Sequence, residues 1–263
     1  MSSAEPGGAS ATSPPASGGA GIGAAAPGGA LLAIDTSTLA AGLALYRDGA
    51  PLAELQWPAG RAQTTAVLHE IDRLLGLAGL TVADLAAVAV ATGPGSFNGL
   101  RVGLSTAKGL VFALGLPLLG VPTLDATAYP HAAGGRPVRA VLAAGRGRLV
   151  SALYRWGEGA PRRAGDYANT SADGLAALIV EPTLVCGEID APLAGRLAAL
   201  ASAAQLPPPA LRGRRAACLA ELAWARLRRG EADDPAELEP VYLHPASTVA
   251  ADAAAMVGAG AKV

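Results

Sequence analysis

A glycine-rich block directly after an apolar run constrains the fold of this chain more than any other feature. Residues 85–92, LAAVAVAT, show no polar alternation, which predicts a strand buried on both faces. The block GPGSFNGLRVG follows at residues 93–103 and carries four glycines and one proline. A strand that passes through such a turn into a helix presents free helix N–H groups beside the sheet edge. The pattern predicts a strand–turn–helix unit to residue 114, and it leaves open whether the turn binds an anion or only packs closely.

The glycine spacing inside this predicted helix bears on that choice. The block has neither the Gly-x-x-x-x-Gly-Lys-Ser/Thr order of a phosphate-binding loop nor a Gly-x-Gly-x-x-Gly fingerprint. Gly99, Gly103 and Ala107 share one helix face, and Gly95 lies just before it. Glycine inside a helix costs about 1 kcal/mol relative to alanine. Such a strip allows another backbone to approach closely, and that backbone can belong to the same chain or to a partner.

The order of predicted elements indicates the fold class. Three strands come first and helices then alternate with strands, which is typical of a ribonuclease-H-like α/β half. We expect strands at 31–37, 40–49, 50–58, 85–92 and 116–122, and helices at 64–79, from the block to 114, and at 123–132, the last capped by Thr123 or Asp125.

The second half repeats this order in a degraded form. It predicts strands in a hairpin at 138–156 with its turn at 145–147, near 161–168 and at 183–187, with helices at 172–179, 191–204 and 214–229. Two such halves are the architecture of the actin-like ATPase and sugar kinase superfamily. We therefore expect a disordered Ala/Gly/Ser/Pro-rich tail at 1–30, an N-terminal lobe at 31–133, a C-terminal lobe at 134–245 and a flexible tail at 246–263.

Composition excludes several classes of function. The formal net charge of −1 argues against strong bulk attraction to nucleic acid or membrane. Two cysteines, Cys186 and Cys218, cannot form a disulfide framework, and three scattered histidines show no metal-ligand spacing. There is no signal segment and no apolar run that could span a bilayer. We expect a cytoplasmic protein without a bound metal, a cofactor or a membrane partner.

The end of the first strand carries the best candidate for a nucleotide site. In kinases of this superfamily an Asp at the position of Asp35 helps to place a metal-bound nucleotide, while Asp35, Thr36 and Ser37 can equally close a turn through hydrogen bonds. A kinase would also need a second phosphate loop with an acidic residue, and residues 143–150, AAGRGRLV, have none. No catalytic acid can be placed between the halves. The nucleotide machinery is incomplete, and we expect no catalytic residue.

Four stretches of the chain resemble one family. LLAIDTS at 31–37, GPGSFNGLRVGLSTAKGL at 93–110, LPLLGVPTLDA at 116–126 and PVYL at 240–243 are similar to the TsaB family, also called YeaZ. The resemblance covers residues 31–245. It implies an actin-like fold without a complete active site, and a role in the threonylcarbamoyl modification of adenosine 37 in tRNA.

The resemblance also implies partners. Family members form a heterodimer with the catalytic homologue TsaD, which carries the metal. A TsaE-like ATPase binds the pair, and tRNA is engaged through the complex. The TsaD interface is a helix bundle built from the first-half helices, which here are the predicted helices near 64–78 and 96–114. The residues expected at this interface are Leu68, Ile71, Leu75, Gly95, Ser96, Gly99, Leu100, Gly103 and Ala107.

The sequence departs from the family pattern at three places. Gln63, Thr64 and Thr65 replace a His-Ser-Glu run, residues 143–148 lack the usual acidic position, and Asn98 replaces a Thr. The first change alters the rim of the expected interface, and the effect of the second stays open.

Three functional hypotheses follow. The first is a non-catalytic partner subunit, for which the sequence leaves open whether the chain alone is a monomer or a homodimer. The second is an actin-like-fold kinase or ATPase that uses Asp35 and the two glycine-rich turns. The third, a peptidase, lacks a nucleophile and a base that can be assembled from the sequence.

Overall fold

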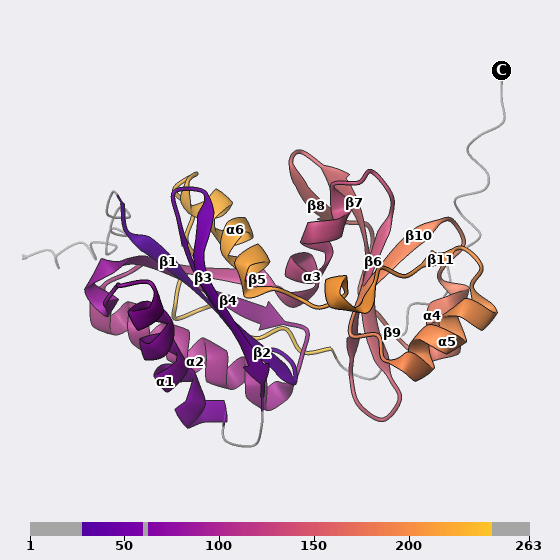
Figure 1. Ribbon diagram of the computed structural model, residues 1–263, viewed down its shortest axis with the longest axis horizontal. Helices are drawn as coiled ribbons and strands as arrows, with labels where there is room; N and C mark the ends of the chain where they lie inside the picture. Colours follow the sequence, from indigo (N-terminus) through magenta and orange to yellow (C-terminus); the bar gives the residue numbers. More distant parts are fainter. Residues whose placement is uncertain (1–27, 60–62, 244–263) are drawn as a thin grey trace, which may run out of the picture.

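Two mixed β-sheets, each covered by helices on both faces, form the part of the chain that this computed structural model describes, residues 28–59 and 63–243 (Figure 1). The sheets belong to two lobes that lie side by side, as the sequence predicts. The predicted tails fall outside the described residues, except that residues 28–30 are described and Ala30 already belongs to the first strand.

The first sheet has the strand order β3-β2-β1-β4-β5. Its strands are β1 (Ala30–Asp35), β2 (Ala40–Arg47), β3 (Ala50–Pro58), β4 (Leu85–Gly93) and β5 (Leu118–Pro122). β1, β2 and β3 form an antiparallel meander, and β4 and β5 join parallel to β1. The β2–β3 turn has positive φ at Asp48 (53°) and Gly49 (82°), as the Asp-Gly signal for a hairpin predicts.

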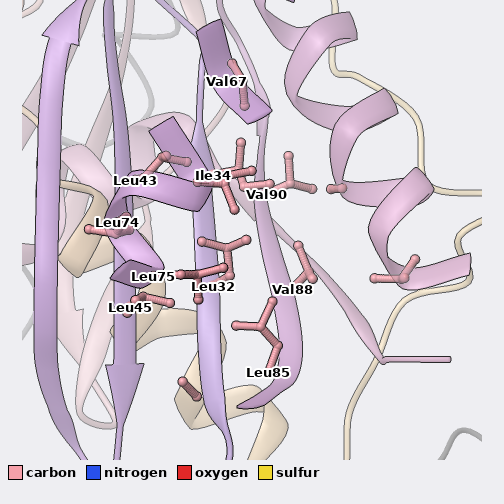
Figure 2. Packing of buried hydrophobic residues seen from close by; sticks show 14 of the residues in the cluster. Leu32, Ile34, Leu43, Leu45, Val67, Leu74, Leu75, Leu85, Val88 and Val90 are labelled. Atoms are coloured by element: carbon pink, nitrogen blue, oxygen red, sulfur yellow. The ribbon is translucent and has the colours of Figure 1, made fainter. Parts of the chain in front are cut away.

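Helices α1 (Gln63–Leu77) and α2 (Phe97–Leu114) cover one face of this sheet, with a short 3₁₀ turn, η1 (Val82–Asp84), before β4 (Figure 1). Alternate strand residues point towards them. Figure 2 shows these side chains meeting the inner face of α1, and the labelled residues are Leu32, Ile34, Leu43, Leu45, Val67, Leu74, Leu75, Leu85, Val88 and Val90. Every second residue of the strands and one face of α1 therefore contribute to the same core.

The other face of the first sheet is lined mainly by small residues and is covered by α6 (Ala216–Leu227), together with α3 (Thr123–Ala132). Ala216, Ala220 and Ala223 of α6 are buried there. The alanines allow the helix to lie close to the sheet. Residues 216–227, assigned by sequence to the C-terminal lobe, thus return to pack on the N-terminal one.

The second sheet has the order β11-β10-β6-β7-β8, and β9 pairs with β7. Its elements are β6 (Val138–Ala143), β7 (Leu149–Gly157), β8 (Ala160–Arg163), β9 (Ala168–Thr170), β10 (Thr183–Gly187) and β11 (Ala204–Gln205), with α4 (Ala172–Ala177), α5 (Ala191–Leu200) and the 3₁₀ turn η2 (Pro209–Leu211). The helix predicted at 191–204 ends earlier, because residues 204–205 pair with β10 as an edge strand. α3 covers one face of this sheet, and α4 and α5 cover the other.

The predicted cap of α3 is wrong. Its N-cap is Pro122, without a side-chain hydrogen bond. Thr123 Oγ1 instead accepts a hydrogen bond from the backbone N of Gly93 at 3.1 Å, and Asp125 Oδ1 accepts one from Tyr154 Oη at 2.7 Å. Both side chains therefore link α3 to neighbouring elements.

A segment after α6 returns along β5 to the start of α2. The backbone N of Asp233 donates to Leu118 O at 2.8 Å, and the backbone N of Val241 donates to Thr92 O at 2.7 Å. Arg226 Nη2 donates a hydrogen bond to Asp233 Oδ1 at 2.7 Å. Near the end of this segment, the ring of Tyr242 packs against that of Phe97, with ring centroids 5.1 Å apart.

Candidate functional site

Asp35, the candidate metal-positioning acid, lies at the carboxyl end of β1 in a buried ion pair. Its Oδ2 accepts a hydrogen bond from Nε of Arg214, and only 3% of Asp35 and 9% of Arg214 are exposed. Arg214 Nη2 also donates to Thr38 Oγ1 at 3.1 Å. The carboxylate that a kinase would direct towards a metal is neutralised by a guanidinium of the same chain.

Thr36 and Ser37 are also engaged within the chain. Ser37 donates from N and Oγ to Asp35 Oδ1 at 3.0 and 2.6 Å. Thr36 Oγ1 donates to Gly99 O at 2.7 Å, and Ser37 O accepts from the backbone N of Ser96 at 2.6 Å. Of the two roles considered for this triplet, turn closure is the one that the geometry supports.

The glycine strip of α2 packs against that same turn. A Cβ added at Gly95 would lie 2.2 Å from Ser37 O, one at Gly99 would lie 2.0 Å from Thr36 O, and one at Gly103 would lie 2.3 Å from Thr36 Oγ1. The strip therefore exists for internal close approach. The expectation that it receives a partner helix is wrong, because the β1–β2 turn already fills the space beside it.

Most of the residues expected at the partner interface are buried inside the lobe. The buried ones are Ile71, Leu75, Gly99, Leu100, Gly103 and Ala107, and those at the surface are Leu68, Gly95 and Ser96. Ser96 also caps α2, since its Oγ accepts from the backbone N of Gly99 at 3.3 Å. Gln63, Thr64 and Thr65 begin α1, but their side chains lie outside the described part of the structure.

Helices α1 and α2 each expose large apolar side chains. Leu68 is 56% exposed, Leu77 65% and Phe112 70%. Gly76 and Gly109 occupy exposed positions in the same two helices, and apart from the local helix backbone no atom lies within 4 Å of a Cβ placed at either. The packing of the lobe therefore does not require these two glycines. Exposed apolar side chains beside small residues are a feature of many protein interfaces, and Leu68 and Leu77, nine positions apart, lie on opposite sides of α1.

The β6–β7 hairpin projects into a hollow between the lobes. Gly145, Arg146 and Gly147 all have positive φ, and Arg146 (52°) is the non-glycine member. The hollow has a volume of about 690 Å³ and is bounded on the other side by the β4–α2 turn, Phe97 and Tyr242. Its lining among the described residues includes Arg146 and Arg148 but no carboxylate.

The described residues show neither a metal-binding cluster nor a reactive thiol. Residues 28–59 and 63–243 contain no group of three or more His, Cys, Asp or Glu side chains that could hold a metal ion. Within the same ranges, no helix has both the length and the apolarity to cross a bilayer. Burial raises the pKa of Cys186 to about 12 and that of Cys218 to about 11, so neither thiol is a ready nucleophile.

Comparison with known proteins identifies the family. Residues 58–259 match the family model described as TsaD, tRNA N6-adenosine threonylcarbamoyltransferase. The chain is 39% identical over 94 residues to the tRNA threonylcarbamoyladenosine biosynthesis protein TsaB of Escherichia coli and 32% identical over 133 residues to that of Bacillus subtilis. These matches span 36% and 49% of this chain, and 40% and 56% of the two relatives.

Longer matches support the assignment. An uncharacterized protein of Mycobacterium bovis is 33% identical over 216 residues, which span 81% of this chain and 90% of that protein. The structure of YeaZ from Pseudomonas aeruginosa is 28% identical, with a TM-score of 0.67, over 82% of this chain and all of that chain. The predicted two-lobed α/β fold class is confirmed. Since the named relatives and the YeaZ structure agree, and the model described as TsaD matches most of the chain, this chain belongs to the TsaB (YeaZ) family.

Proposed function

We propose that this chain is a non-catalytic subunit that pairs with a TsaD-like transferase in the formation of threonylcarbamoyladenosine in tRNA. Relatives named TsaB are biosynthesis proteins of this nucleoside, and the family model that matches the chain is named for the transferase. A TsaE-like ATPase and tRNA are the further partners proposed for the complex. A cytoplasmic location is part of the same proposal.

The Asp35–Arg214 pair is the observation that carries the non-catalytic part of the proposal. A kinase or ATPase would need the Asp35 carboxylate to bind a metal-bound nucleotide. Here that carboxylate forms an ion pair with the buried guanidinium of Arg214. Moving Arg214 aside would leave two uncompensated buried charges, which is strongly unfavourable. Phosphoryl transfer at this position is therefore disfavoured.

The α1–α2 layer is the surface that we propose for the partner. Leu68, Leu77 and Phe112 expose apolar area there, and Gly76 and Gly109 leave room for a close backbone. A TsaD-like homologue would present the equivalent layer, because both chains match one family model. Two homologous helix pairs can then pack face to face, as in a two-fold dimer. A second copy of this chain is the expected occupant when the homologue is absent.

Co-purification with the TsaD homologue of the same organism, followed by mass determination in solution, tests the proposal. We expect a one-to-one complex, loss of that complex in Phe112→Glu, and an intact complex in Val180→Glu. Val180 is the matched control because it is an apolar side chain, 83% exposed, just after α4 in the other lobe.

Two results would reject the proposal. One is a chain that stays alone or as a homodimer in the presence of the homologue. The other is an intrinsic ATPase activity of the purified chain that Asp35→Ala abolishes, which would favour the kinase hypothesis instead.

A further inference from the structure

The hollow between the lobes is lined by Arg146 and Arg148 and by no described carboxylate, although Glu188 and Asp190 line a neighbouring hollow that also includes Arg148. Arg148 donates from Nε to Asn169 Oδ1 at 2.8 Å and from Nη2 to Asn169 O at 2.6 Å, so it is held by neutral acceptors. Arg146 stands exposed at the tip of the same hairpin and makes no ion pair with the described residues. A guanidinium that is fixed without a carboxylate is preorganised for an anionic ligand.

The opposite wall of the hollow adds to this potential. Phe97 begins α2, a helix of 18 residues with no acidic side chain in its first turn. The positive end of the helix dipole therefore lies across the hollow from the two arginines. An anion between these walls would be attracted from both sides.

Two aromatic rings stand at the mouth of the hollow. Phe97 is 51% exposed and Tyr242 is 38% exposed, and their planes are tilted by 36°. Arg101 Cζ lies over one face of the Phe97 ring, 4.0 Å from its centroid, so a ligand can stack only on the parts of the two rings that stay exposed. Exposed rings beside cationic groups form a platform on which a planar, electron-rich ligand stacks.

A second hollow continues the same surface beyond Tyr242. It has a volume of about 360 Å³, and its lining includes Arg101, Lys108 and Glu239. Tyr242 lines both hollows. The described lining of the two hollows carries four cationic side chains, Arg101, Lys108, Arg146 and Arg148, against the single carboxylate of Glu239.

We propose that this track binds a single-stranded segment of RNA, with phosphates at the arginines and bases on Phe97 and Tyr242. Alternating cationic and aromatic groups are the chemistry by which proteins bind single-stranded nucleic acid. A polymer fits better than a free nucleotide because the track continues on both sides of Tyr242. The choice of RNA over DNA rests on the proposed function. Binding needs no metal ion, since the larger hollow has no carboxylate among its described lining.

Fluorescence anisotropy of a labelled RNA octamer with the full chain, over a series of salt concentrations, tests this proposal. We expect Arg146→Gln to lower the salt slope of log K by about 0.7, the value for one phosphate contact on a single strand. Tyr242→Ala should weaken binding at least about fivefold through loss of stacking. Arg228→Gln is the control, because Arg228 is an exposed cation at the end of α6, and we expect its affinity to stay within about twofold of the wild type. Circular dichroism spectra and unfolding curves confirm that each variant is folded.

Several outcomes overturn the proposal. Equal losses in Arg146→Gln and Arg228→Gln would mean diffuse attraction and no track. Displacement of the octamer by ADP at the same nucleotide concentration would assign the hollow to a free nucleotide. Loss of affinity on addition of EDTA would indicate a metal-dependent site.

The same variants separate this proposal from the pairing proposal. Arg146→Gln should still form the one-to-one complex with the TsaD homologue, since Arg146 lies on the β6–β7 hairpin of the other lobe, whereas Tyr242 packs against Phe97 of α2. A chain that pairs but does not bind the octamer overturns the RNA track alone. A chain that binds the octamer through Arg146 but never pairs overturns the proposed function alone.

Discussion

Arg214 donates to the carboxylate of Asp35 across 179 positions of sequence, and both side chains are buried at the junction of β1 with the segment that leads into α6. This pair fixes the chain where it crosses from the second lobe back to the first. It also occupies the acid that the sequence offers as a metal-positioning group.

Removal of one partner of this pair should destabilise the fold strongly. We expect Arg214→Met to lower the free energy of unfolding by about 3 to 5 kcal/mol, because it leaves the Asp35 carboxylate buried without a counterion. Arg196→Met is the control, since Arg196 pairs with Asp173 at the surface, with side chains 56% and 60% exposed. There we expect little or no change in the free energy of unfolding, because water screens an ion pair at the surface. Urea unfolding measures both, and equal small losses would contradict a structural role for the buried pair.

Glycine substitutions in α2 should have opposite effects at two positions. A Cβ at Gly103 would meet Thr36 Oγ1 at 2.3 Å, whereas a Cβ at Gly109 meets nothing within 4 Å. We expect Gly103→Ala to lower the free energy of unfolding by about 1 to 3 kcal/mol through overpacking. Gly109→Ala should raise it by up to about 1 kcal/mol through helix propensity.

A double-mutant cycle checks the cause. In a Thr36→Ala background the Gly103→Ala substitution should be better tolerated, because the clashing hydroxyl is gone. If the free-energy changes of the two substitutions are additive, the cost of Gly103→Ala does not arise from contact with Thr36.

The element order can be predicted from the sequence because each element carries a local signal. Asp48-Gly49 specifies a hairpin, Ser96 supplies the cap of α2, and Gly115 ends that helix at a φ of 67°. Strand β11 carries no such signal, since two residues at a sheet edge are too few to form a pattern. Its pairing with β10 is decided by the tertiary structure.

The candidate site could be predicted only in part, because periodicity gives the face of a helix and not what covers it. The spacing of Gly99 and Gly103 correctly indicates a close approach, and the approaching group is the β1–β2 turn rather than a partner. Arg214 could not be identified, since Arg212 and Arg215 flank it and no local pattern indicates which of them turns inward. The exposed Phe112 becomes evident only once the inner face of α2 is known.

Stability should depend on pH through Asp125. Burial raises the pKa of this carboxyl, and the hydrogen bond from Tyr154 opposes the rise only in part. Because its folded pKa lies above the unfolded one, the wild type loses stability as pH rises from the unfolded pKa through the folded value. Asp125→Asn keeps an oxygen acceptor for Tyr154 and stays neutral. We therefore expect the stability of Asp125→Asn relative to the wild type to increase from acidic to neutral pH.

Asp173→Asn is the control for this pH dependence, with the opposite sign. Asp173 lies at the surface, and its hydrogen bond with Arg196 lowers its pKa. The wild type therefore gains stability above the unfolded pKa of this carboxyl, and that gain is lost as pH falls through the folded pKa. Thermal unfolding from pH 4 to pH 7.5 measures both trends. Parallel trends in the two variants would contradict the role of burial at Asp125.

The two cysteines should resist alkylation in the folded chain. Both are buried, and burial raises the pKa of Cys186 to about 12 and that of Cys218 to about 11, so the reactive thiolate is scarce at pH 8. We expect iodoacetamide to modify neither in the native protein and both in urea, as followed by intact mass. Val180→Cys provides the matched control, because that position is 83% exposed and its thiol should react readily in the native state. If Cys186 or Cys218 is alkylated in the native protein as fast as the introduced thiol, the core around them opens on the timescale of the reaction.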